Sequence, residues 1–207
     1  MKLIFKYLFI HLAIVLAVAV PIVSAEQIAE QLSFADIVRE QNLSSREISL
    51  GYRHAVPSVS DVFKDNILLN LAYMSGKVNN TQEIDWTVVR EPAVYEFTLK
   101  PGEVFAYHDN VKPEYQGRVV KTANAHFSKE EGFRFSGLYY GDGICQFASL
   151  IYWAAKDAGL KAESEVNHDF AVIPEVPAEY GVSIFYSLGS YETTMRQHLY
   201  VETTFDY

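Results

Sequence analysis

The stretch "YYGDGICQFASLIYWAAKDAGL", residues 139–160, decides the fold of this chain. Gly159 near its end is a typical helix stop, and the spacing ahead of it predicts a helix over residues 145–158. Gly141 and Gly143 predict a tight turn that lets the backbone approach a ligand closely. The only cysteine of the chain, Cys145, therefore begins the predicted helix. The apolar residues at helical spacing are Phe147, Leu150, Ile151, Ala154 and Ala158.

A cysteine in the first turn of a helix meets unpaired backbone amides and the positive end of the helix dipole. Both favour the thiolate, so the position predicts a lowered pKa for Cys145, although the acidic neighbour Asp142 opposes this. Thiol hydrolases place their nucleophile in this way and take a histidine from a later strand as base. The candidate base is His168, in "EVNHDF".

Other residues of the stretch are candidates for holding the substrate. Gln146 and the helix-start amides could donate hydrogen bonds to an oxyanion, which makes Gln146 the third catalytic candidate. Gly141, Gly143 and Tyr140 are the candidates for substrate binding. The alternative is that Cys145 is a small buried hydrophobe and that His168 is structural.

The rest of the chain predicts an α+β fold, with an antiparallel sheet packed against two or three helices and Cys145 at the N-terminus of the central helix. Ser60 is a candidate cap for a helix over residues 61–75. The segments "AVYEFTL" and "EVFAY" flank "KPG", which predicts a hairpin with a type II turn. Later strands are expected in "FAVI", "VSIFYSL" and "HLYVETTF".

The N-terminus has the pattern of a secretory signal peptide. Lys2 and Lys6 lead into the apolar run "YLFIHLAIVLAVAVPIV", and small residues follow before Glu26. Cleavage is expected after Ala25. The alternative is an uncleaved membrane anchor, because the run is nearly long enough to span a bilayer. Membrane contact is expected through this segment alone.

Charge and cysteine content restrict the partners. The net charge is -9, which argues against nucleic acid as a partner because such proteins need a basic face. One cysteine cannot form an internal disulfide, so an exported chain would keep a free thiol. The histidines His108, His126 and His168 lack the close spacing of metal ligands, and we expect no metal and no cofactor.

Three segments, "LKPGEVFAYHDNV", "GDGICQFASLIYWAAKDAGL" and "NHDF" with the V-P turn after it, together resemble the VanW-like domain of bacterial cell-envelope proteins. The resemblance spans about Asn66 to Tyr186. Asp142 replaces the middle glycine of the family's glycine triplet, and Asp169 replaces a serine. With the N-terminal pattern, we expect three parts: residues 1–25 as signal peptide or membrane anchor, 26–57 as a polar N-terminal segment and linker, and 58–207 as the VanW-like domain that the resemblance implies.

The resemblance implies an exported cell-envelope protein with peptidoglycan or its stem peptides as partner, and it supplies no reaction. Together with the residues, it predicts a domain that acts on or recognises peptidoglycan peptides. As an enzyme, Cys145 would attack an amide carbonyl, His168 would carry the proton and Gln146 would hold the oxyanion, giving amide hydrolysis or transpeptidation. The alternative is a non-catalytic module that binds peptidoglycan or another envelope protein.

Overall fold

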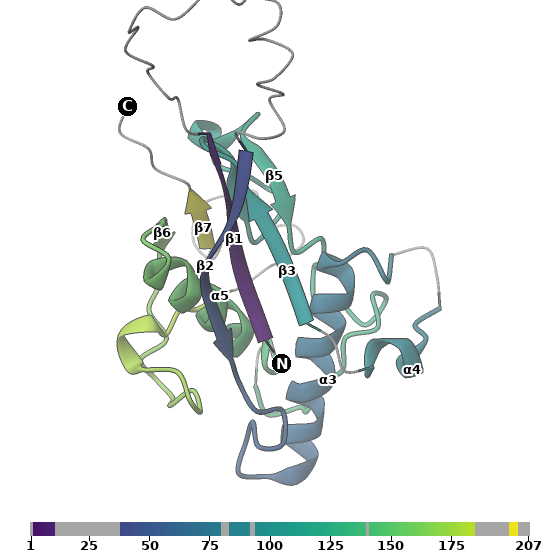
Figure 1. Cartoon of the computed structure of the whole chain (residues 1–207). Coiled ribbons are helices and arrows are strands. Elements are labelled where there is room, and N and C mark those ends of the chain that lie inside the picture. The colour runs from purple at the N-terminus through teal and green to yellow at the C-terminus, as the bar shows by residue number, and fades with distance from the viewer. Residues whose placement is uncertain are drawn as a thin grey trace, which may run out of the picture.

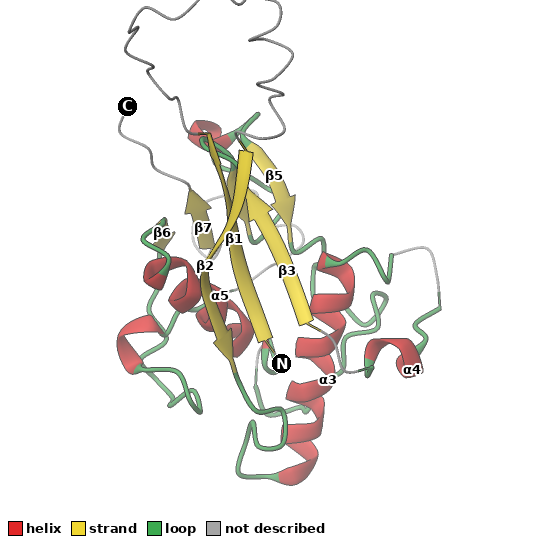
Figure 2. Ribbon diagram, viewed as in Figure 1, coloured by secondary structure: helices red, strands yellow, loops and turns green. Residues whose placement is uncertain are grey.

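The computed structural model describes residues 2–10, 38–79, 83–91, 94–139, 141–184 and 199–202 (Figures 1 and 2). The α+β class is confirmed. In chain order the elements are β1 Lys2–Ile10, β2 Val38–Glu47, α3 Pro57–Met74, α4 Trp86–Val89, β3 Val94–Leu99, β4 Val104–Ala106, the 3-10 helix η1 Pro113–Tyr115, β5 Val119–Thr122, α5 Ile144–Asp157, β6 Lys161–Ser164, the 3-10 helix η2 Ala178–Tyr180 and β7 Leu199–Glu202.

The strands form two mixed sheets, so the prediction of one antiparallel sheet is wrong. In the order β2-β1-β3, the middle strand β1 is antiparallel to β2 and parallel to β3. In the order β5-β4-β7-β6, β4 is parallel to β5 and antiparallel to β7. Parallel neighbours need a long crossover. Residues 107–118, with η1 among them, provide it between β4 and β5.

The predicted hairpin forms its turn but not its ladder. The Glu103 N–H donates to the Lys100 carbonyl at 2.9 Å, and Gly102 has φ +80°, as a type II turn requires. However, β3 pairs with β1, whereas β4 has β5 on one edge and β7 on the other. Both edges of β4 are therefore occupied, and the turn connects two sheets.

The other strand predictions have mixed outcomes. The segment "FAVI", residues 170–173, is irregular, so that prediction is wrong. In "VSIFYSL", Val182 forms an isolated bridge with Asn167, and residues 185–188 lie outside the described residues. In "HLYVETTF", β7 is observed and pairs with β6, a strand that the sequence pattern did not indicate.

Helix α3 begins at Pro57, earlier than expected, because proline suits the first turn of a helix. Ser60 lies inside the helix, and its hydroxyl accepts a hydrogen bond from the Arg53 N–H at 2.8 Å instead of capping. Apolar side chains of α3 such as Ile67 and Leu69 are fully buried, each contributing about 1.5–3 kcal/mol.

Helix α5 is the element that joins the parts of the fold. It contacts α3, both β1 and β2 of one sheet, and both β6 and β7 of the other (Figure 1). Its buried face includes Phe147, Leu150 and Ile151, which have no exposed surface. The start of α5 is consequently held from several sides, which is what a site built there requires.

Strand β1 lies within the segment predicted to be a signal peptide. Cleavage after Ala25 would remove β1, the middle strand of the β2-β1-β3 sheet. The predicted cleavage position, within residues 11–37, is outside the described residues. Among the helices that the structure describes, none has the length and apolar character needed to cross a membrane.

Candidate functional site

The turn before α5 is fixed by its contact with α3. Gly143, the N-cap residue, has φ +102°, and a Cβ there would lie 2.8 Å from the Cα and the carbonyl oxygen of Phe63. The close approach that this glycine permits is therefore to the backbone of α3. Gly141 shapes the same turn, with φ +78° and a carbonyl that accepts from the Ile144 N–H at 2.9 Å.

A buried asparagine of α3 clamps this turn. The Asn66 amide donates to the Arg134 carbonyl at 2.9 Å and to the Asp142 carbonyl at 3.0 Å, and it accepts from the Arg134 N–H at 2.9 Å. The Asp142 carboxylate is buried and accepts from the N–H and the hydroxyl of Ser136. The acidic neighbour of Cys145 is thus turned toward Ser136.

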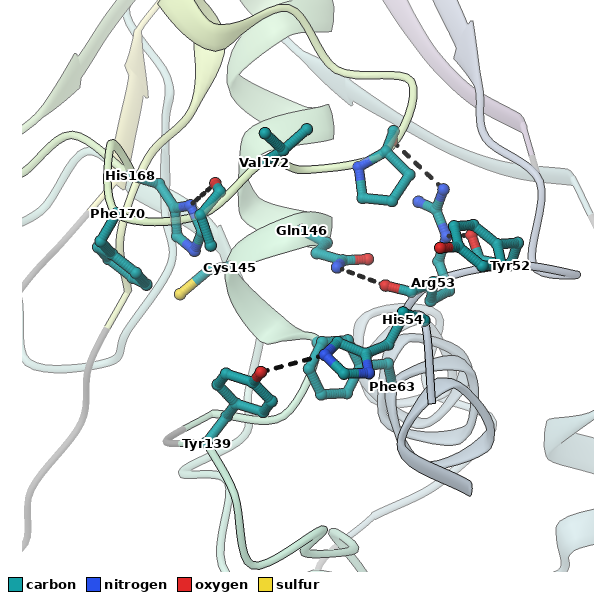
Figure 3. Close-up of a pocket in the computed structure, with 14 residues that line it drawn as sticks. Tyr52, Arg53, His54, Phe63, Tyr139, Cys145, Gln146, His168, Phe170 and Val172 are labelled. Carbon is teal, nitrogen blue, oxygen red and sulfur yellow. Dashed lines mark hydrogen bonds between the residues drawn. The ribbon is translucent and has the colours of Figure 1, made fainter. Parts of the chain in front are cut away.

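Beside the start of α5 lies a cavity of about 460 Å³ (Figure 3). Gly143, Cys145 and Gln146 line it from α5, and segments 52–55 and 168–174 line it from other sides. Its rim is apolar and exposed: Tyr52 is 59%, Phe170 71% and Val172 91% exposed. Pockets of this size with an apolar lining and a few polar groups are typical ligand sites.

The thiol of Cys145 is half-buried and held by the backbone of Ile184. The Ile184 N–H lies 3.5 Å from Sγ, and the Ile184 carbonyl lies 3.7 Å from it. Burial raises the pKa of Cys145, and the amides of Ile184 and of Cys145 itself only partly offset this. The prediction of a lowered pKa is therefore wrong, because desolvation of the thiolate outweighs the helix-start amides.

Most amides at the start of α5 already have acceptors. The N–H groups of Gln146 and Phe147 both donate to the Gly143 carbonyl, at 3.1 and 3.3 Å. The Ile144 N–H is taken by Gly141, as described above. An oxyanion near Sγ would consequently face the Cys145 amide alone among these groups.

His168 lines the same cavity as Cys145 and is half-buried. Its Nδ1 lies 3.1 Å from the Ala171 carbonyl, so the neutral ring carries its proton there and leaves Nε2 as an acceptor. Burial lowers the pKa of His168, more than the Ala171 carbonyl and the charge of Asp169 raise it.

Cys145 and His168 share one side of the cavity, and Arg53 and Tyr52 lie on the opposite side (Figure 3). Within the described residues, the hydrogen bonds of the thiol go to Ile184, and none joins it to His168. The fold thus brings the two predicted catalytic residues to one cavity but does not pair them.

Gln146 is buried and turned toward Arg53, away from the thiol (Figure 3). Its Nε2 donates to the Arg53 carbonyl at 3.0 Å. Its Oε1 has no hydrogen-bond partner among the described residues. This arrangement ties α5 to the segment before α3 and does not aim the amide nitrogen at an oxyanion.

Of the substrate-binding candidates, Gly143 lines the cavity, whereas Tyr140 lies outside the described residues. Its neighbour Tyr139 lines the cavity, and the Tyr139 hydroxyl lies 3.1 Å from His54 Nε2. Nδ1 of His54 accepts from the Val56 N–H at 3.0 Å, so Nε2 is the donor to Tyr139.

Sequence reasoning missed the contribution of residues 52–63 to this site. Segment 52–55 reads as a polar linker, and no local pattern shows that it folds against α5. Arg53 is fully buried there, with Nη2 3.0 Å from Glu175 Oε2. Burial lowers the pKa of Arg53, and Glu175 opposes this. The sequence pointed to this contribution only through Arg53 and His54, two polar side chains between apolar neighbours.

A family described as VanW like protein matches residues 88–204, more than half of the chain. Comparisons with curated proteins and with solved structures gave no match. The matched residues include Cys145, Gln146 and His168, whereas Arg53, His54 and Phe63 precede them. Within the described residues, no three His, Cys, Asp or Glu side chains gather as a metal site would require.

Proposed function

We propose that this chain, which belongs to the VanW-like protein family, is an exported cell-envelope protein whose cavity recognises peptides of peptidoglycan. The observation that carries the proposal is the cavity of about 460 Å³ at the start of α5, in the segment with the family's G-I-C-Q sequence. Its apolar rim suits small aliphatic side chains, and its few polar groups suit a peptide backbone.

Recognition is the function that the resting geometry supports best. The thiol is hydrogen-bonded to the Ile184 backbone rather than to His168, and burial raises its pKa. With the pKa of His168 lowered, the resting pair consists of a neutral thiol and a neutral imidazole at neutral pH. A peptide can bind to such a cavity without reacting.

The second candidate is amide hydrolysis or transpeptidation, favoured by Cys145 and His168 lining one cavity with Nε2 of His168 left as an acceptor. His168 Nε2 would take the Sγ proton as Sγ attacks the amide carbonyl carbon. The C–N bond would then break, and the same proton would pass to the leaving amine, leaving a thioester. Water or a second amine would release the acyl group. The oxyanion would face the Cys145 amide, because Gln146 is turned toward Arg53.

One experiment separates these candidates. Defined muropeptides are titrated into wild-type protein and into Cys145→Ser, and the mixtures are then analysed for new products by mass spectrometry. Recognition predicts binding by both proteins and no products. Catalysis predicts products with the wild type and none with Cys145→Ser. Binding by neither protein would refute the recognition of peptidoglycan peptides.

Export is tested separately by fractionating cells that produce the full chain and sequencing the N-terminus of the recovered protein. A chain that begins at Glu26 supports the signal peptide, and a membrane-associated chain that keeps residues 1–25 supports the anchor. Recovery from the cytoplasm with β1 intact would contradict export.

A further inference from the structure

The cavity wall opposite Cys145 holds a buried positive charge, Arg53, whose side chain has no exposed surface. Its Nε donates to the Tyr52 carbonyl at 2.9 Å, and its Nη2 donates to Glu175 at 3.0 Å and to the Pro174 carbonyl at 3.3 Å. Its Nη1 has no acceptor among the described residues. A buried guanidinium usually has all its donors engaged, so this one has capacity for another acceptor.

A second unsatisfied group lies beside it. Oε1 of Gln146 is buried and has no donor among the described residues, while its Nε2 is fixed by the Arg53 carbonyl. The cavity lining therefore combines an N–H that lacks an acceptor with a C=O that lacks a donor. A peptide terminus has the complementary pair, a carboxylate and the N–H of its last residue.

The charge around the cavity selects an anion. None of the described residues that line it is acidic, and the fixed charge in the lining is the guanidinium of Arg53. The carboxylate that offsets Arg53 belongs to Glu175, which is outside the lining and 47% exposed. The cavity therefore presents a guanidinium to a ligand and no carboxylate among its described lining residues. A guanidinium attracts anionic ligands, and more strongly in a site poor in water.

We infer that the cavity binds short peptides by their free C-terminal carboxylate, which is held by Arg53, with the N–H of the last residue donating to Gln146. The inference rests on the proposed function, because it names the substrate class of that site. Nη1 of Arg53 and Oε1 of Gln146 are buried atoms, so the charge of Arg53 first attracts the carboxylate through space, before a hydrogen bond forms. The hydrogen bond from Nη2 to the Pro174 carbonyl is the longest that Arg53 makes, and the carboxylate would replace that carbonyl as acceptor. The carboxylate would then accept from both Nη1 and Nη2, which is a bidentate contact.

Nη1 of Arg53 has no acceptor among the described residues and offers a donor to a carboxylate, and the exposed apolar rim of Tyr52, Phe170 and Val172 matches aliphatic side chains. Arg53 lies outside residues 88–204, so this feature comes from the N-terminal part of this chain and not from the matched family segment. The carboxylate would lie across the cavity from Cys145, with the peptide backbone between them (Figure 3).

The test uses Cys145→Ser, in which turnover is blocked, and calorimetric titration with one peptidoglycan stem peptide in two forms, free acid and C-terminal amide. We expect the free acid to bind at least about tenfold more tightly, with an advantage that shrinks as salt is added. Equal affinities would overturn the carboxylate inference and leave peptide recognition standing. Binding of neither form would overturn both.

Arg53→Lys on the same background should reduce the affinity for the free acid about tenfold and leave the amide unchanged, because lysine keeps the charge but loses the planar fork. The control is Arg118→Gln, which removes an arginine outside the cavity and should change neither affinity. Should Arg53→Lys fail to fold, as judged by circular dichroism, the comparison of acid and amide on the Cys145→Ser protein still decides the inference.

Discussion

Replacement of Gly143 by alanine should destabilise the domain strongly, for two separable reasons. The first is backbone strain, since φ +102° costs an alanine about 1–3 kcal/mol. The second is overlap, since the new Cβ would lie 2.8 Å from the Cα and carbonyl oxygen of Phe63, which are backbone atoms of α3 and cannot rotate away. Overpacking of this kind costs about 1–3 kcal/mol. The sum is a large fraction of the roughly 5–15 kcal/mol that stabilises a typical domain.

Gly137→Ala is the matched control, because Gly137 has φ +79° and nothing within 4 Å of its Cβ position. The assay is urea denaturation followed by circular dichroism, with the free energy of unfolding compared among wild type, Gly137→Ala and Gly143→Ala. Gly137→Ala should lose the strain energy alone, and Gly143→Ala about 1–3 kcal/mol more. Equal losses would refute the close packing of the α5 start on α3. They would also refute the argument that this packing positions Cys145.

Three further predictions concern Cys145, His126 and Asn66. Because burial raises the pKa of Cys145 above the ordinary 9.0, iodoacetamide should alkylate it more slowly than a free thiol at pH 8. The rate of alkylation should increase only at higher pH. Rapid labelling at pH 6 that His168→Ala abolishes would contradict this prediction. Burial opposes the charge on His126, but hydrogen bonds to Asp109 and Glu131 outweigh it and raise its pKa above 6.5. The stability that His126 contributes relative to His126→Gln should therefore be complete below pH 6.5 and fade as pH rises through the raised pKa, which urea melts at pH 5.5 and 8.5 would show. Asn66→Ala removes three hydrogen bonds and should lower the free energy of unfolding by about 1.5–4 kcal/mol in the same melts. A loss under about 0.5 kcal/mol would show that the turn before α5 does not depend on Asn66.

The features that local sequence predicts are those that local forces produce. Helix α5 runs over residues 144–157, close to the predicted 145–158, because the apolar spacing and the glycines at either end act within a few residues of one another. The type II turn at Pro101 and Gly102 forms for the same reason. The resemblance to the VanW-like family rests on such segments too, since the G-I-C-Q sequence is read directly from neighbouring residues.

Pairing and burial were decided only by the tertiary structure. The strand after the turn pairs with β5 and β7 rather than with β3, because strand partners depend on contacts far apart in the chain. Desolvation at the packed α5 start reverses the predicted pKa shift of Cys145. Arg53, in a segment that reads as linker, becomes a buried charge in the cavity wall because Glu175 and Pro174, more than a hundred residues later, fold over it. The sequence alone therefore located the cysteine and its helix, whereas long-range packing set the ionisation of the thiol and the positive charge across the cavity.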